Sequence, residues 1–295
     1  MSSATLPANP NASARIVLAV AVACVSTGSI FARLAECPAL AIAAWRMTFA
    51  TALVSLALVR WWPELRGLTQ RDFWLGGAAG VCLAVHFATW ISSLNHTTVA
   101  SSVVLVNTSP MWVALMSPFI TRERIGWRAW AGIALSFVGA TVIAGSDLRV
   151  GGAALVGDSL ALAGGLSVAV YLLLGRQLRA HLSLPTYCTL TYANATVALW
   201  IIVAVTGVNA SGFTAKTWSA IAGMAVVAQI GGHTFYNWSL KHLPTSAVAV
   251  ALLGEPIGSS LLAWRIFGEV PPTATLSGAA LVLLGIYFAV SNTKK

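Results

Sequence analysis

One acidic side chain, Glu255, stands in the middle of a long apolar stretch, next to Pro256. An ionisable group at the depth of a membrane is costly and marks a functional site by default. The proline leaves a backbone carbonyl one turn earlier without its helical donor, and the small residues Ala251, Gly258 and Ser259 leave room around the acid. The pattern predicts a site for an ammonium group or a proton. A structural alternative stays open, in which a protonated Glu255 stabilises a bent helix.

Further polar and aromatic residues occur at the same depth of other apolar stretches. His86 and Trp90 are four residues apart, and Gln229, His233 and Tyr236 also have helical spacing, so each set is expected on one helix face. Aromatic faces bind ammonium groups and aromatic side chains. For each histidine alone, a hydrogen bond between helices is the alternative. The predicted substrate-binding residues are His86, Trp90, Asn107, Tyr171, Gln229, His233, Tyr236 and Glu255.

Two prolines and one arginine complete the residues of interest inside apolar stretches. Pro110 and Pro256 are predicted hinges, where a helix bends. Asn107 precedes the first bend and would offer a polar group there, or else only a hydrogen bond between helices. Arg46 is expected to pair with an acidic residue near the outer surface of the membrane, or to extend its charged end towards the lipid headgroups.

The elements that must position these residues are membrane-spanning helices. The 295-residue chain is 58% hydrophobic and 8% charged, with a mean hydropathy of +0.81, whereas soluble domains carry about 25% charged residues. Apolar runs long enough to cross a bilayer lie at 16–33, 39–60, 73–94, 98–120, 127–145, 153–174, 186–206, 218–240, 245–267 and 272–291. The predicted fold class is therefore an all-α membrane protein with ten transmembrane helices.

The basic residues indicate how the chain lies in the membrane. With a cytoplasmic N-terminus, 12 lysines and arginines fall on the inner side and 4 on the outer side. The inner set is Arg15, Arg60, Arg66, Arg71, Arg122, Arg124, Arg128, Arg176, Arg179, Lys241, Lys294 and Lys295, and the outer set is Arg33, Arg149, Lys216 and Arg265. This asymmetry predicts that both termini are cytoplasmic. It also accounts for the net charge of +9 without nucleic-acid binding.

The second half of the chain repeats the first. A shift of 146 residues carries Ser93, Pro110, Glu123, Gly132 and Gly139 onto Ser239, Pro256, Glu269, Gly278 and Gly285. The repeating unit holds five runs, and an odd number of crossings forces the second copy to enter from the opposite side, which is the inverted repeat of secondary transporters. The predicted units are a tail at 1–14, repeats at 15–148 and 149–292, and a tail at 293–295.

These repeated features resemble a known family. The central prolines, the glutamates that follow them and the glycine-rich helices that close each half are similar to the two EamA repeats of the drug/metabolite transporter superfamily. The start of the second half, Gly157 through Tyr171, also fits this pattern. Length and layout look most like the bacterial YddG-type exporters. That resemblance implies ten helices, location in the bacterial inner membrane, alternating access, and outward movement of aromatic and other neutral amino acids.

Other functions find less support in the sequence. No HExxH, GxSxG or Walker A motif is present, so an embedded enzyme is disfavoured and neither ATP nor any other cofactor is expected. Anionic substrates would need several cations at the site, whereas zwitterionic amino acids suit the aromatic residues and Glu255. Export of hydrophobic cations is the alternative. Proton coupling, and the choice between a monomer and a homodimer, stay open.

Overall fold

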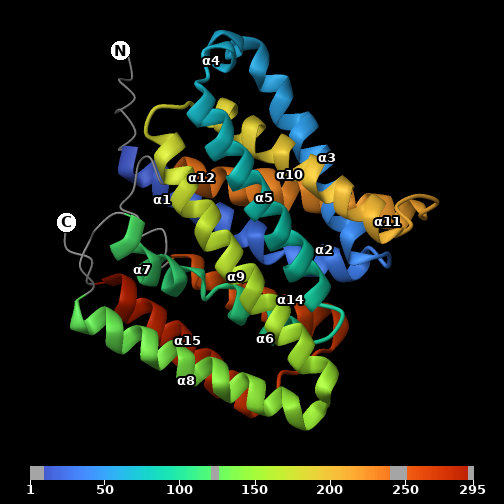
Figure 1. Cartoon of the computed structure of the whole chain (residues 1–295). Coiled ribbons are helices and arrows are strands. Elements are labelled where there is room, and N and C mark those ends of the chain that lie inside the picture. Colours follow the sequence, from blue (N-terminus) through green and yellow to red (C-terminus); the bar gives the residue numbers. More distant parts are fainter. Residues whose placement is uncertain (1–9, 121–125, 240–250, 292–295) are drawn as a thin grey trace, which may run out of the picture.

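The structure is a computed structural model that describes residues 10–120, 126–239 and 251–291 (Figure 1). Every regular element in these ranges is a helix, as the all-α prediction requires. Several residues used in the predictions lie outside them, namely the two terminal tails up to residue 9 and from 292, Arg122, Glu123, Arg124, Lys241, Lys294, Lys295 and the beginning of the run 245–267.

The helices of the first half correspond to the first five apolar runs. They are α1 (Pro10–Ser26), α2 (Gly28–Leu34), α3 (Ala39–Leu56), η1 (Ala57–Arg60), α4 (Trp62–Arg66), α5 (Gln70–Ser93), α6 (Val99–Val106), α7 (Ser109–Ile120) and α8 (Trp127–Val150). The local sequence explains where several of these helices begin. Thr69 and Asp72 form a capping box at α5, and the Thr98 side chain accepts from Ser101 N at α6.

The helices of the second half correspond to the last five runs. They are α9 (Gly152–Arg179), α10 (Leu184–Thr206), α11 (Ala215–Gly223), η2 (Met224–Thr234), α12 (Phe235–Ser239), α14 (Gly254–Phe267) and α15 (Thr273–Ser291). Gly207 and Gly268 follow α10 and α14 with left-handed backbone angles, φ 65° and 68°, which a glycine adopts without steric cost.

Within the described ranges, seven stretches are long and apolar enough to cross a membrane. They are Ala14–Leu34, Ala39–Leu56, Gln70–Ser93, Val99–Met116, Trp130–Asp147, Gly152–Arg179 and Leu184–Thr206, and a shorter apolar helix covers Thr273–Phe288. The chain is therefore a multi-pass helical membrane protein. The full count of ten crossings remains a prediction, because three of the ten runs give no such stretch within the described ranges. They are the run with the segment from α11 to α12, the run with α14 and the run with α15.

The contact between α8 and α15 displays the inverted repeat directly. A Cβ added to Gly139 would lie 2.6 Å from Gly278 O, and one added to Gly285 would lie 2.5 Å from Gly132 O. The shift of 146 residues carries Gly139 onto Gly285 and Gly132 onto Gly278, so the two contacts are equivalent under the repeat. Gly132 of α8 contacts Gly285 of α15, and the later residue Gly139 contacts the earlier residue Gly278. The two helices are therefore equivalent in sequence and antiparallel in space.

Two further hydrogen bonds lie close to the pseudo-two-fold axis. Ser136 Oγ on α8 donates to Val282 O on α15 at 3.3 Å, and these positions are 146 residues apart. On the other side of the molecule, the hydroxyls of Thr51 on α3 and Thr196 on α10 are 2.9 Å apart, with a separation of 145 residues. The axis therefore passes between α8 and α15 and between α3 and α10.

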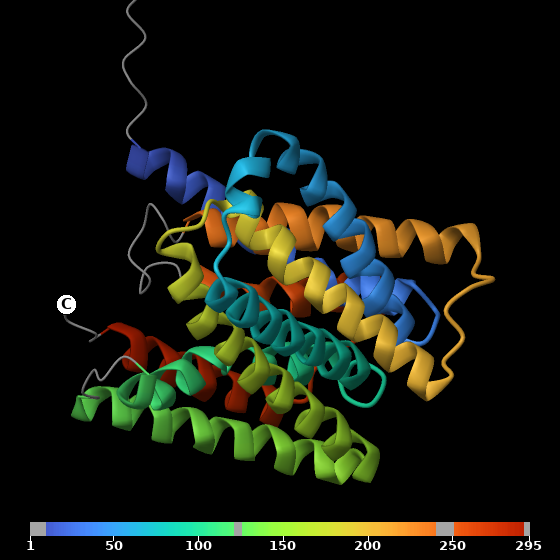
Figure 2. The ribbon, with the colours of Figure 1, turned by 45° about the horizontal axis from the view of Figure 1, so that its top comes forward.

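Helix α5 lies between α9 and α10 (Figure 2). Its small residues permit this close approach. A Cβ on Gly80 would lie 2.5 Å from Asn194 Cβ and 2.8 Å from Thr191 O, and one on Gly76 would overlap Leu190. Small residues let helix backbones come close enough for van der Waals contact in a membrane.

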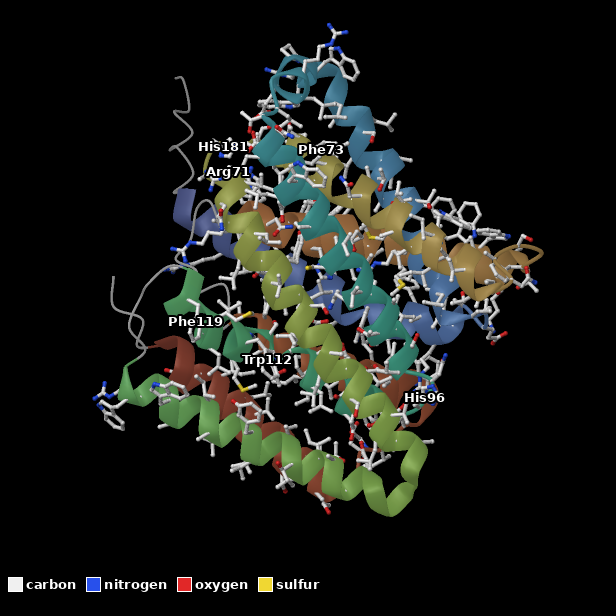
Figure 3. All side chains as sticks on the ribbon, in the orientation of Figure 1. Arg71, Phe73, His96, Trp112, Phe119 and His181 are labelled. Carbon is white, nitrogen blue, oxygen red and sulfur yellow. The ribbon has the colours of Figure 1, made fainter. Side chains whose placement is uncertain are left out.

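Polar contacts gather at the two ends of the bundle, and Figure 3 shows Arg71 and His181 at one end and His96 at the other. At the first end, Glu64 accepts hydrogen bonds from Ser183 N at 2.7 Å, from Ser183 Oγ, and from Thr186 Oγ1 at 2.6 Å. Burial by itself would raise the pKa of Glu64, but these hydrogen bonds outweigh it and lower the pKa.

At the opposite end, Arg33 Nη2 donates to Thr97 O at 3.0 Å, and Val99 N donates to Glu269 Oε1 at 2.6 Å. The first described turn of α1 and the last of α15 lie towards the end that carries α4 (Figure 1).

Candidate functional site

A buried arginine on α3 forms the centre of the site. Arg46 has no exposed surface, and its Nε and Nη2 atoms donate to Gln229 Oε1 on η2 at 3.0 and 2.6 Å. Its guanidinium carbon lies 3.9 Å from the ring centroid of Phe87 and 5.8 Å from that of Trp90, both on α5. Charge-assisted hydrogen bonds and the faces of aromatic rings are the contacts that suit a buried guanidinium. One side chain thus joins α3, α5 and η2.

The expectation that Arg46 pairs near the outer surface or extends to the headgroups is wrong. Position 46 lies about 10 Å along the axis from the start of α3 and about 15 Å from its end, at 1.5 Å per residue. That is too far for the side chain to reach either membrane surface, so the charge is held by partners at its own depth. Arg46 and Phe87 are the site residues that the sequence prediction missed. The available signal was the presence of a charge inside an apolar run.

The α5 side of the site contains two stacked rings. The rings of His86 and Trp90 have centroids 6.1 Å apart and planes 7° apart, which confirms that they share a helix face. His86 Nδ1 also hydrogen-bonds Gly164 O on α9 at 2.9 Å, so this histidine does link two helices. The ring of His233 lies 6.5 Å from that of His86 and 5.7 Å from that of Phe87, between centroids.

The segment that carries Gln229 and His233 is a π-helix, η2. Its hydrogen bonds run from i to i+5, and such segments are uncommon and frequent at functional sites. Thr234 Oγ1 donates to Gln229 O, five residues earlier, at 3.2 Å. The wider turn changes which residues share a face. Gln229 and His233 point to the site, whereas Tyr236 on α12 packs against the buried cluster of Ala14 and Leu18 on α1.

The predicted acid lies where two helices are interrupted. Asn107 Nδ2 donates to Glu255 Oε2 at 3.3 Å and to Val103 O at 2.9 Å, and so connects α6 of the first half with α14 of the second. Glu255 is half-buried and is the second residue of α14. The positive end of the helix dipole favours a carboxylate there.

The two predicted hinges are breaks between helices. Helix α6 ends at Val106 and α7 begins at Ser109, so Pro110 is the second residue of a new helix. Helix α14 begins directly after a turn at Leu253, and Pro256 is its third residue. A proline in a first helical turn lacks only an N–H that has no helical acceptor. The chain is therefore irregular near both prolines, but neither proline bends a continuous helix.

Tyr171 belongs to a separate buried group. Its hydroxyl accepts a hydrogen bond from Asn237 Nδ2 at 3.2 Å, and its ring lies 6.3 Å from that of Tyr187, between centroids. The structure thus gathers six of the eight predicted residues around Arg46 or beside Glu255 and places Tyr171 and Tyr236 apart from them. Within the described ranges, no group of three or more His, Cys, Asp or Glu side chains could hold a metal ion.

Arg46 and Glu255 do not form an ion pair with one another. Arg46 and Glu255 interact electrostatically, but the ion pairs found in the described part of the chain join other residues. The arrangement is a cation with the aromatic rings of α5 against it, and an acidic group more than a salt-bridge distance away. It suits a ligand that carries both charges and an apolar group.

Comparison with known proteins identifies the class to which this fold and site belong. The EamA-like transporter family matches residues 12–145 and 155–291, so each half of the chain is one copy of the family's repeat. The chain belongs to the EamA-like transporter family, within the drug/metabolite transporter superfamily.

Its relatives are named as transporters. An uncharacterized transporter of Archaeoglobus fulgidus is 25% identical over 81% of this chain and 85% of its own length. The riboflavin transporter of Rhizobium johnstonii is 27% identical over 72% and 68% of the two chains. The pseudopaline exporter CntI of Pseudomonas aeruginosa is 27% identical over 73% and 74%. These names indicate transport and no enzymatic reaction, and they cover chemically different substrates.

A solved structure supports the fold. It shares 20% sequence identity with this chain, covers 95% of it and 97% of its own chain, and has a TM-score of 0.64. At this identity the likeness concerns the arrangement of the helices.

Proposed function

We propose that this transporter exports small zwitterionic solutes, above all aromatic and other neutral amino acids, across the bacterial inner membrane. Both termini would be cytoplasmic, and the protein would act by alternating access of one central site to the two faces of the membrane. The inverted repeat supports this mechanism. Two halves that can exchange conformations provide an outward-open and an inward-open state of similar energy.

The observation that carries the proposal is the position of Glu255. This acid is bonded by Asn107 of the other half and lies at the start of a helix after a break. A substrate ammonium would replace or join the amide as its partner. The rings of Phe87 and Trp90 on α5 would receive the apolar side chain, since aromatic faces accept both aromatic groups and cations. A ligand held by both halves would be released when the halves move apart at one face.

A second candidate substrate is a hydrophobic cation. Glu255 and the aromatic rings alone would suit such a molecule. The cationic Arg46 opposes it, because a like charge nearby in a site of low dielectric is unfavourable.

Flux through purified protein in liposomes tests the proposal. Labelled phenylalanine and other neutral amino acids are compared with a lipophilic cation, with and without a pH gradient. We expect amino-acid flux, and we expect Glu255→Gln to reduce its rate and change its pH dependence. Glu36→Gln is the matched control, because Glu36 is exposed and pairs with Lys216 at the surface. Flux of the cation and of no amino acid would reject the proposal, and an unchanged Glu255→Gln protein would reject the role of this acid.

A further inference from the structure

Two buried hydrogen-bond donors around the centre of the site have no partner. They are Arg46 Nη1 and Trp90 Nε1, whereas the side chain of Gln229 also hydrogen-bonds Tyr192. Arg46 and Gln229 have no exposed surface and Trp90 is 4% exposed. Buried polar groups are paired in the large majority of cases, and an unpaired one is costly. Since both atoms are N–H donors, the partner that suits them is a hydrogen-bond acceptor.

The geometry explains why Arg46 Nη1 is free. The Gln229 carbonyl oxygen receives two hydrogen bonds from Arg46, so its amide group is oriented with the NH₂ away from the guanidinium. The face of the guanidinium is covered by the Phe87 ring at 3.9 Å. A guanidinium donates only in its own plane, so Nη1 remains as the free edge. The Trp90 ring lies 5.8 Å from the same guanidinium carbon.

We infer that Arg46, oriented by Gln229, binds the carboxylate of the transported solute, with Trp90 Nε1 as a further donor. The inference rests on the proposed function and adds the second half of substrate recognition. The carboxylate lies at Arg46 and the ammonium at Glu255. A carboxylate supplies acceptors for Arg46 Nη1 and Trp90 Nε1, and it compensates a buried cation that has no ion-pair partner in the described structure. Solutes that lack an acid group are excluded because they leave this cation unpaired.

The test compares phenylalanine with phenylalaninamide, in which a neutral amide replaces the carboxylate. Binding to the purified full-length protein is measured by thermal shift, and transport is measured in liposomes. We expect the amide to bind roughly 10- to 100-fold more weakly, as the loss of hydrogen bonds to a charged group implies. Arg46→Gln should remove this preference, and Arg46→Lys should retain part of it. Arg60→Gln, which changes an exposed arginine, should leave it unchanged.

Gln229→Glu gives an independent test that keeps the buried arginine paired if Arg46→Gln does not fold. The new carboxylate would occupy the donors of Arg46, so phenylalanine should lose its advantage over the amide while the protein elutes as wild type from a sizing column. If either folded variant keeps the wild-type preference, or the wild type itself makes no distinction, the inference is overturned. Failure of the proposed function looks different, because the wild type would then carry no amino acid at all.

Discussion

Replacement of Gly139 by alanine probes the contact between α8 and α15 that the inverted repeat creates. The new Cβ would lie 2.6 Å from Gly278 O and 2.7 Å from Val282 N, whereas ordinary van der Waals contact begins at 3.4 Å. The neighbours are backbone atoms, which cannot rotate away, so the helices must separate by about 0.8 Å. Overpacking of this kind costs about 1–3 kcal/mol. Because position 285 is the two-fold equivalent, Gly285→Ala should cost a similar amount.

The control for this substitution lies on the same helix. An added Cβ on Gly145 of α8 meets nothing within 4 Å, so Gly145→Ala changes helix propensity alone and should be neutral or stabilising by up to about 1 kcal/mol. Thermal unfolding in detergent, followed by tryptophan fluorescence, should place Gly139→Ala roughly 2–10 °C below Gly145→Ala. If Gly139→Ala melts at or above Gly145→Ala, the close packing of α8 on α15 is not what holds these helices together.

Two further perturbations test the ends of the molecule and its axis. Glu64→Gln should reduce stability by about 1–3 kcal/mol at neutral pH, since it removes a carboxylate that accepts from Ser183 and lies outside the membrane spans. The folded pKa of Glu64 is lowered, so its contribution is present above the unfolded value of about 4.3 and is lost as pH falls through the folded value; melting curves of wild type and variant should converge in acid, and a constant gap would contradict this. The double variant Thr51→Cys and Thr196→Cys should form a disulfide on mild oxidation, because the two hydroxyls are 2.9 Å apart; the absence of a band shift on a non-reducing gel, with both single variants as controls, would place the axis elsewhere.

The helical class and the inverted repeat could be predicted because each rests on a physical constraint that acts along the chain. A segment inside lipid must satisfy its own backbone hydrogen bonds, so long apolar runs become helices. The register of 146 residues then predicts that Gly139 and Gly285 are equivalent. The structure shows them in equivalent contacts.

The site could be predicted in part. Helical spacing placed His86 and Trp90 on one face correctly, because α5 is a regular helix. The same spacing misplaced Tyr236 relative to Gln229, because η2 is a π-helix, and the hydrophobic period of a short run does not reveal a change of helix type.

The sequence by itself determined that Glu255 and Arg46 stand inside apolar runs, where a charge is costly and needs polar partners. The tertiary structure alone decided which partners these are, and that Arg46 finds them at its own depth and not near the membrane surface. Gln229 stands 183 residues from Arg46, and Asn107 stands 148 residues from Glu255. The depth of a charge is set by its own helix, whereas its neighbours are set by how the two halves pack across the axis. The charge that apolar patterning would send to the membrane surface is therefore kept at its own depth by Gln229 and the Phe87 ring.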